Sequence, residues 1–269
     1  MSKKRLEKLK IVFEIGANSE KLESGSEIAI GRYRQTRGLN DIEALKTIVE
    51  TMKASNLKTE FKENGEGNPI SADLYLRKVA EQGYWSRPLE VDGLCFCFSI
   101  LPKFSLCIVS IEELCTGSVR DWTNWIEPFI FKNGFMQAWV SDVEYDYWQN
   151  AQDPLQYEAA GLDYSNLAKK SNGLPPPLEQ IEIDTSVNPG KWLFRENYIE
   201  AIGSPMWLGE PFWEKVGYDR KQLLQKFNDL NLVTLPHGVL RLSVGSESFF
   251  DSSTELIQRK LRWILYGTE

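Results

Sequence analysis

Two β-prone runs in the first half of the chain constrain the fold more than any other feature of the sequence. Residues 94–100 and 105–111 are dominated by apolar and aromatic side chains, and only a short proline-containing segment separates them. This spacing predicts an antiparallel hairpin. A helix is expected at about 121–131 and a long strand from about 135 to 148. The order strand–strand–helix–strand is typical of an α+β fold, an antiparallel sheet with helices packed on one face.

Helix start signals support this interpretation. Asn40 precedes a segment with helical apolar spacing, and Glu43 follows three residues later in the capping-box position. We therefore expect a helix over Asp41–Ala54. Its buried stripe is predicted to contain Ile42, Leu45, Ile48, Val49 and Met52.

The C-terminal part of the chain repeats this order in outline. A Trp-rich strand and turn is expected at 192–203, then a loop or short helix at 205–217, then a helix capped by Asp219. Residues 239–244 alternate as a strand does, and a last helix runs from 252 to the C-cap at 267. The order of elements indicates two similar ββαβ-like halves, although no sequence repeat links them.

Four segments follow from these patterns. Residues 1–38 are basic and punctuated by Gly and Ser, which predicts an irregular N-terminal segment. Residues 39–160 form the N-terminal α+β half. Residues 161–190 contain three consecutive prolines and two Gly/Asn turns, which predicts a connection without long helices or central strands. Residues 191–269 form the C-terminal α+β half.

Charge and apolar content exclude several classes of function. The net charge of −7 disfavours nucleic acid and anionic membranes as partners and favours a basic partner, although an acidic surface also serves solubility alone. No apolar run is long enough to span a membrane, and charged residues occupy the place of a signal-peptide core. We expect a cytoplasmic protein. Its cysteines are expected to be reduced, small buried hydrophobes: Cys95, Cys97, Cys107 and Cys115.

Motifs for self-contained chemistry are missing from the sequence. His237 is the only histidine, it lies in a turn, and no nucleophile elbow accompanies it. The cysteine spacing is not that of a zinc site, and no glycine-rich phosphate loop is present. We therefore expect no enzyme activity, no cofactor and no metal.

The strongest candidate site is the segment 141–148. On a strand, Asp142, Glu144 and Asp146 would share one face at intervals of roughly 6.5–7 Å. Three interpretations compete: a solvated sheet face, a docking surface for Lys and Arg of a partner protein, and a carboxylate acid/base or metal site. The docking interpretation adds nearby aromatic anchors. These anchors are Tyr145, Tyr147 and Trp148.

A second cluster spans residues 207–213 and is aromatic and broken by Gly and Pro. It is either a core-filling loop packed over the sheet or an exposed loop of aromatic anchors. The anchor interpretation assigns partner contacts to Trp207, Glu210 and Trp213.

The C-terminal third also resembles a known group of proteins. Residues 198–204, then Trp207-Leu208-Gly209-Glu210-x-Phe212-Trp213, then 238–242 and a closing helix resemble immunity proteins of bacterial polymorphic-toxin systems, of the immunity protein 52 type. Tyr84-Trp85-x-Arg87-Pro88 is similar to the aromatic opening of that group. The resemblance implies a cytoplasmic α+β protein that binds and neutralises a cognate toxin delivered by contact-dependent or type VI-like secretion. It transfers no functional residue.

The leading hypothesis is therefore an immunity protein that occludes a toxin by protein–protein contact. Two alternatives stay open. One is a carboxylate-dependent enzyme acting on a small substrate, and the other is a structural subunit of a bacterial assembly.

Overall fold

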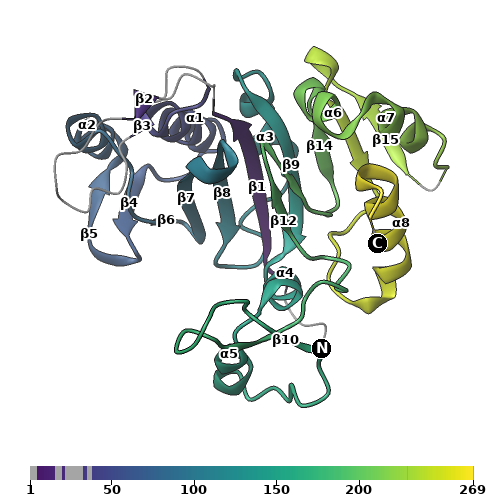
Figure 1. Ribbon diagram of the computed structural model, residues 1–269. Helices are drawn as coiled ribbons and strands as arrows, with labels where there is room; N and C mark the ends of the chain where they lie inside the picture. The colour runs from purple at the N-terminus through teal and green to yellow at the C-terminus, as the bar shows by residue number, and fades with distance from the viewer. Residues whose placement is uncertain (1–4, 16–19, 22–32, 35–37, 229, 269) are drawn as a thin grey trace.

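The computed structural model describes residues 5–15, 20–21, 33–34, 38–228 and 230–268. Its centre is a ten-stranded antiparallel sheet that crosses the whole molecule, in the order β15-β16-β14-β9-β1-β8-β7-β6-β4-β5 (Figure 1). The strands of this sheet are β1 (Glu7–Glu14), β4 (Glu60–Glu63), β5 (Glu66–Ser71), β6 (Leu89–Val91), β7 (Leu94–Leu101), β8 (Leu106–Glu113), β9 (Phe135–Asp142), β14 (Met206–Leu208), β15 (Asn231–Thr234) and β16 (Leu240–Ser243). The fold is α+β, as the sequence predicts.

The hairpin predicted around residue 100 is confirmed. β7 and β8 pair antiparallel along their whole length, and the short helix η1 (Pro102–Phe104) joins them. Ser105 closes the turn with a left-handed φ of 54°. The hairpin then continues the sheet on both sides, because β8 pairs with β1 and β7 pairs with β6.

Strand β1 corrects the prediction that residues 1–38 are irregular. It lies in the middle of the sheet, paired with β8 on one side and β9 on the other. Leu9, Ile11 and Phe13 point to one face and are fully buried. The sequence does not predict this strand, because Lys8 and Lys10 alternate with the apolar residues and make the segment look basic and irregular. In the structure these two lysines lie on the opposite face of the strand.

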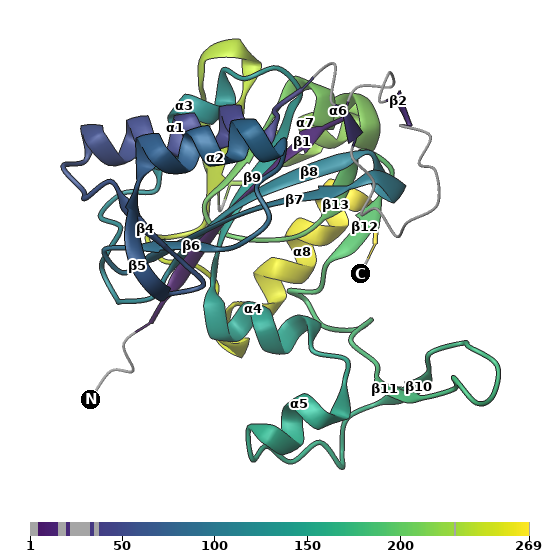
Figure 2. The same ribbon diagram turned by 90° about the vertical axis from the view of Figure 1, so that its left-hand side faces the viewer.

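One face of the sheet is covered by the helices of the N-terminal half (Figure 2). These are α1 (Asp41–Ala54), α2 (Ala72–Gln82) and α3 (Thr123–Ile130). Helix α1 has the predicted bounds and cap, with Asn40 Oδ1 accepting a hydrogen bond from Glu43 N at 2.8 Å. The apolar sides of these helices and of β1, β7, β8 and β9 form the first core.

The opposite face is covered near β9, β14 and β16 by α6 (Glu210–Val216), α7 (Tyr218–Gln225) and α8 (Glu255–Tyr266). Helices α1, α2 and α3 therefore pack on one face of the continuous sheet and α6, α7 and α8 on the other, and α4 (Val143–Asn150) and α5 (Pro154–Ala159) of the N-terminal half also lie on the side opposite α1, α2 and α3 (Figure 2). Helix α7 begins after Gly217, so Asp219 lies in its first turn and is not the predicted cap. Helix α8 follows the short helix η3 (Ser252–Thr254) and ends at Gly267, as predicted.

The remaining elements lie outside the large sheet. They are α4 (Val143–Asn150), α5 (Pro154–Ala159), η2 (Pro236–Gly238) and three two-stranded pairs: β2 (Glu20–Lys21) with β3 (Tyr33–Arg34), β10 (Lys169–Ser171) with β11 (Ile181–Ile183), and β12 (Leu193–Arg195) with β13 (Tyr198–Glu200). Helix α4 corrects the predicted strand over 135–148, since β9 ends at Asp142.

The prediction that all four cysteines are buried is also wrong: only Cys107 is buried, whereas Cys95 and Cys97 are half-buried and Cys115 is exposed.

Candidate partner-binding site

The predicted row of carboxylates is not formed, because its residues lie on a helix rather than a strand. Asp142 caps α4, and its Oδ1 accepts a hydrogen bond from Tyr145 N at 2.8 Å. Burial raises the pKa of the Asp142 carboxyl. Asp146 is buried and forms an ion pair with Lys8, at 2.5 Å between Oδ2 and Nζ. Only Glu144 is exposed, so the three carboxylates share no face and no site.

The three predicted aromatic anchors also differ in exposure. Tyr145 is half-buried, and its hydroxyl oxygen accepts a hydrogen bond from Gln258 Nε2 at 2.9 Å. Trp148 is half-buried against Tyr157, with 4.9 Å between ring centroids. Tyr147 is exposed and packs edge-on against Trp148. Of these three predicted anchors, Tyr147 is the most exposed, at 45%.

The aromatic segment 207–213 is part of the core rather than an exposed loop. Trp207 lies on β14 and Trp213 on α6, and both are fully buried. Gly209 allows this packing, because a Cβ there would lie 2.7 Å from the carbonyl oxygen of Phe135. Glu210 is half-buried and pairs with Lys221 at 2.5 Å. The core-filling interpretation fits this arrangement, and the two tryptophans cannot be contact anchors in it.

The structure instead presents a different candidate surface, a projecting arm of residues 143–190. It comprises α4, α5, the β10–β11 pair and the loops that join them, and α5 and the β10–β11 pair extend away from the sheet (Figure 2). The arm has a small core of its own, in which Trp148 and Tyr164 pack around buried Tyr157 and Ile183. Backbone hydrogen bonds close it, including Ile183 N to the carbonyl oxygen of Gln152 at 2.8 Å.

Side-chain hydrogen bonds fix the root of the arm to the body. Asn150 Oδ1 accepts from Trp192 N at 2.7 Å, and Asp146 Oδ1 accepts from Trp192 Nε1 at 2.9 Å. From the other side, the buried Arg262 of α8 donates to the carbonyl oxygens of Pro189 and Lys191. Because both ends of the arm are held, its surface is presented in one orientation relative to the sheet.

The surface of the arm combines negative charge with exposed apolar side chains. Its 48 residues carry eight carboxylates and two lysines, a net charge of −6 out of −7 for the chain, and one of the eight, Asp146, is buried in its ion pair with Lys8 of the body. It also carries eight of the eighteen large apolar side chains that are exposed in the described chain. These are Tyr147, Leu155, Leu162, Leu167, Leu174, Leu178, Ile181 and Val187. Exposed apolar side chains gathered on one projection are typical of a contact surface.

Sequence reasoning found one end of this arm and missed the rest. Residues 161–190 were expected to be only a connection, because their prolines and glycines exclude long elements. The signal that marks them is the excess of carboxylates together with isolated leucines such as Leu155, Leu174 and Leu178. Those leucines do not recur with a helical or strand period, so the sequence predicts no apolar face on which they would be buried together.

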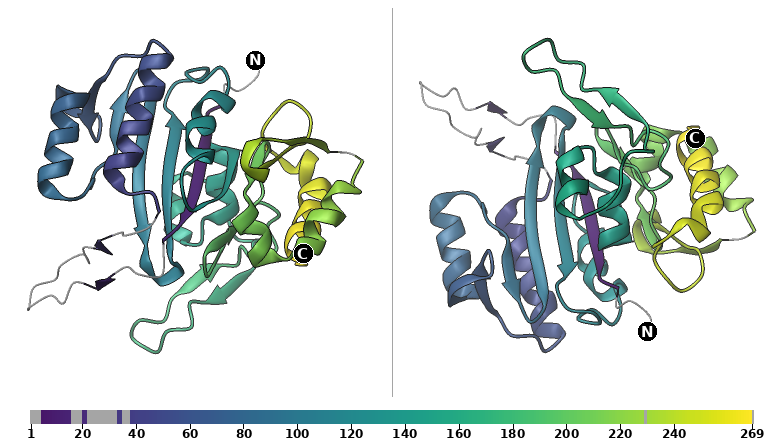
Figure 3. Two further views of the ribbon diagram at one scale, coloured as in Figure 1. Left: turned by 90° about the horizontal axis from the view of Figure 1, so that it is seen from above. Right: turned by 90° about the horizontal axis from the view of Figure 1, so that it is seen from below.

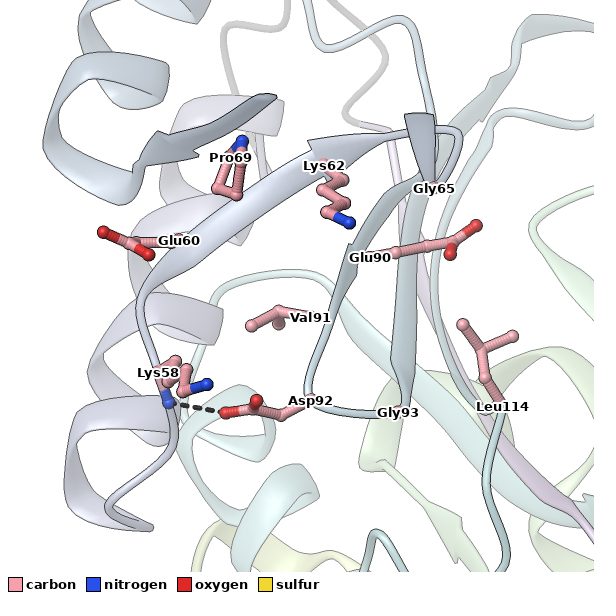
Figure 4. Close-up of a pocket in the computed structure, with 10 residues that line it drawn as sticks. All are labelled: Lys58, Glu60, Lys62, Gly65, Pro69, Glu90, Val91, Asp92, Gly93 and Leu114. Atoms are coloured by element: carbon pink, nitrogen blue, oxygen red, sulfur yellow. Dashed lines mark hydrogen bonds between the residues drawn. The ribbon is translucent and has the colours of Figure 1, made fainter. Parts of the chain in front are cut away.

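A pocket of about 300 Å³ lies elsewhere, between β4 and the turn that joins β6 to β7 (Figure 4). Lys58, Lys62, Glu60, Glu90 and Asp92 line it, but their charged ends point in different directions. The Asp92 carboxylate already has a hydrogen-bond donor within the chain, because its Oδ2 accepts a hydrogen bond from Lys58 N at 2.8 Å. The pocket therefore assembles no group of side chains around a common ligand.

Other chemistry-bearing residues are also dispersed. His237 lies in η2 with a φ of 57° and packs edge-on against Phe131, at 5.2 Å between ring centroids. Within the described residues, no three His, Cys, Asp or Glu side chains are grouped as metal ligands would be. The same part of the chain holds no helix with the length and apolar character that crossing a bilayer requires.

Comparison with known proteins adds a structural likeness. No protein-family model matches the chain, and no curated protein matches it. A solved structure of a Pseudomonas aeruginosa T6SS protein is similar over 97% of this chain and 72% of its own, with 13% sequence identity and a TM-score of 0.49. A likeness at this level assigns no function, so function is inferred below from this chain's own residues.

Proposed function

We propose that this chain is an immunity protein that binds a toxin protein with a basic contact surface and blocks it in the cytoplasm. The observation that carries the proposal is the arm of residues 143–190, where net charge −6 and exposed leucines occur on the same rigid projection. The toxin would be one delivered by type VI-like or contact-dependent secretion, in keeping with the resemblance of the C-terminal third to polymorphic-toxin immunity proteins.

Charge and apolar area have separate roles in this proposal. The carboxylates steer a basic partner toward the arm and raise the association rate, which falls as salt screens them. The leucines then lose water on contact and hold the complex, so they act mainly on dissociation. The fixed root lowers the entropy lost on binding, because the arm needs no ordering.

The basic partner is also favoured by what surrounds the arm. Outside the arm the chain carries 30 acidic and 29 basic residues, so that part is nearly neutral. When most of the net negative charge of a molecule lies on one part of it, the negative electrostatic potential is concentrated there and attracts a basic partner to that part. The carboxylate-dependent enzyme is disfavoured by the separation of Asp142, Glu144 and Asp146, which share no site.

The first experiment uses the toxin domain encoded by the neighbouring gene as the probe. The variant Glu144→Lys/Glu158→Lys/Glu179→Lys reverses three exposed charges of the arm. Its matched control, Glu50→Lys/Glu81→Lys/Glu127→Lys, makes the same charge change on exposed positions of α1, α2 and α3. We expect the arm variant to slow association about tenfold or more at low salt, with much less effect from the control.

The second experiment separates contact from steering. Leu155→Ala/Leu178→Ala removes two arm side chains that are 65% and 63% exposed, and Leu256→Ala on α8 removes one that is 85% exposed. We expect only the arm variant to speed dissociation, by about tenfold or more. The proposal is wrong if the unmodified chain neither binds the neighbouring toxin domain nor restores growth to cells that express it. Tight binding to a non-toxic neighbour would identify a structural subunit instead.

A further inference from the structure

The loop that joins β10 to β11 forms the outer end of the arm and is not packed against the body. Figure 2 and Figure 3 show it at the end of the hairpin that lies farthest from the sheet. In the range 171–180 every residue is exposed except Asn172, which is half-buried. Core packing therefore does not hold this loop in shape, and its conformation depends on hydrogen bonds.

Asn172 provides most of these hydrogen bonds. Its Oδ1 accepts from Leu174 N at 3.1 Å and from Gln180 N at 3.2 Å. Its Nδ2 donates to the carbonyl oxygen of Leu178 at 3.0 Å, and its backbone N donates to the carbonyl oxygen of Gln180 at 2.9 Å. One residue therefore connects the start, the far side and the end of the loop.

Three prolines restrict the loop further. Pro175, Pro176 and Pro177 each have a φ that is fixed by the ring. Leu178 N donates to the carbonyl oxygen of Pro175 at 3.0 Å and closes a turn around them. A loop restricted in this way loses little conformational entropy when a partner covers it, so its contacts are not offset by a large ordering cost.

The surface chemistry of this loop differs from that of the rest of the arm. No charged residue occurs between Lys170 and Glu179. Leu174 and Leu178 stand on either side of the prolines and are 50% and 63% exposed. In protein–protein contacts, apolar side chains typically form the centre and charged side chains the rim. An uncharged, apolar end on an acidic arm has this arrangement.

We propose that residues 172–180, here called the tip, are a preformed anchor that fills an apolar hollow on the toxin. This rests on the proposed function and specifies the contact site of the toxin. Aliphatic or aromatic side chains line the hollow, and Lys and Arg around it meet the carboxylates farther back on the arm. The tip projects into solvent, so only a concave surface covers Leu174, the prolines and Leu178 together.

The first experiment needs no partner and tests whether the tip is preformed. Amide hydrogen exchange of the full-length chain is followed by NMR for the unmodified protein and for Asn172→Ala. We expect the Leu174 and Gln180 amides to exchange about tenfold or more faster in the variant, because both lose their acceptor. The amide of Ile183, which bonds to Gln152, is the internal control. Unchanged exchange at Leu174 and Gln180 would overturn the preformed tip.

The second experiment measures binding to the toxin domain encoded by the neighbouring gene. Asn172→Ala keeps every apolar side chain of the tip and removes the hydrogen bonds of its amide group, whereas Leu174→Ala removes one apolar contact. We expect each variant to raise the Kd about tenfold or more. The matched control Asn166→Ala, at another exposed asparagine of the arm, should leave the Kd unchanged. None of these variants alters a charge, so the salt dependence of association should stay the same.

Leu174→Asp tests the hollow itself. It should raise the Kd about tenfold or more beyond Leu174→Ala, because an apolar hollow desolvates the added carboxylate. Equal Kd values for these two variants would mean that residue 174 stays in water in the complex, which contradicts a hollow. If the unmodified chain binds the toxin and the Asn172 and Leu174 variants bind equally well, the tip is not the anchor and the immunity proposal stands. If the unmodified chain does not bind, both proposals fail.

Discussion

At the scale of single residues, the central sheet contains a buried ion pair that no local sequence pattern predicts. Lys8 and Asp146 are 138 positions apart in the numbering, yet both are buried and their charged atoms lie 2.5 Å apart. Asp146 also accepts the indole N–H of Trp192. A buried charge with one partner removed keeps its desolvation cost, so each member depends on the other.

We therefore expect Lys8→Met to destabilise the fold by about 3–5 kcal/mol, because Asp146 would be left buried without its cation. The double variant Lys8→Met/Asp146→Asn keeps an acceptor for Trp192 and removes the unpaired charge. It should be more stable than Lys8→Met alone. Urea unfolding of the two variants and the unmodified chain checks this. If the second substitution adds to the first, the two residues are not coupled.

Lys10 supplies the second prediction at this scale. Its pKa is about 7 in the folded chain, against an ordinary 10.5. Between these values the unfolded chain holds more protons, so the contribution of Lys10 to stability rises with pH over this window. Below pH 7 both states are protonated and the full cost of the buried charge is present.

Lys10→Met should thus stabilise the chain most at and below pH 7, with a gain that shrinks toward pH 10.5. The slope has a ceiling of about 1.4 kcal/mol per pH unit, and solvent screening of the half-buried amine should keep it well below that. Unfolding free energies measured from pH 6 to 10 test the difference, with Lys103→Met as an exposed control. Parallel curves for the two variants would contradict the prediction.

At the scale of elements, the end of β9 shows why 143–148 is a helix although its apolar pattern alternates. Val143 N donates to the carbonyl oxygen of Leu6, the residue before β1. Among the described residues, no strand pairs with the chain beyond this point. Asp142 then caps the helix, and Glu144 and Asp146 fill its first turn, where carboxylates are favoured by the helix dipole.

Asp142→Ala should destabilise the chain by about 1 kcal/mol, within a range of roughly 0.5–2, because Tyr145 N loses its acceptor. Asp142→Asn should retain most of the stability, since the amide oxygen can accept the same hydrogen bond. Thermal unfolding of both variants measures the contrast. Equal losses would mean that the carboxylate charge, rather than the cap, is what matters at this position.

At the scale of the whole molecule, the continuous sheet joins the two predicted halves through β1 and β9. Strand β14 of the C-terminal half pairs directly with β9, and Gln137 of β9 binds the backbone of Ile199 at 2.7 Å and 3.2 Å. The division into N-terminal and C-terminal α+β halves stays a prediction. In the folded chain both halves share hydrogen bonds along one sheet.

Deletion of residues 1–14 should therefore abolish cooperative folding of the whole chain, because β8 and β9 lose the strand between them. It also removes the fully buried Leu9, Ile11 and Phe13. Replacing residues 172–180, the exposed connection of β10 to β11, with a short Gly-Ser turn should leave folding intact. Near-UV circular dichroism and a single unfolding transition report both outcomes. A cooperative fold without residues 1–14 would contradict this account.

Local signals were enough to predict α1 with its cap, the β7–β8 hairpin, the end of α8 and the α+β class, because each depends on neighbours a few positions apart. They were also enough to direct attention to the acidic region around Asp142–Trp148. Long-range pairing decided the rest: which strand lies beside β8 and β9, where β9 stops, and whether Trp207 and Trp213 face solvent or core. Tertiary packing alone turned Asp146 into the buried partner of Lys8, and it left the carboxylates and leucines of the arm together at the surface. The physical reason is that a local pattern records the period of an element, whereas burial and charge pairing depend on what the rest of the chain places against it.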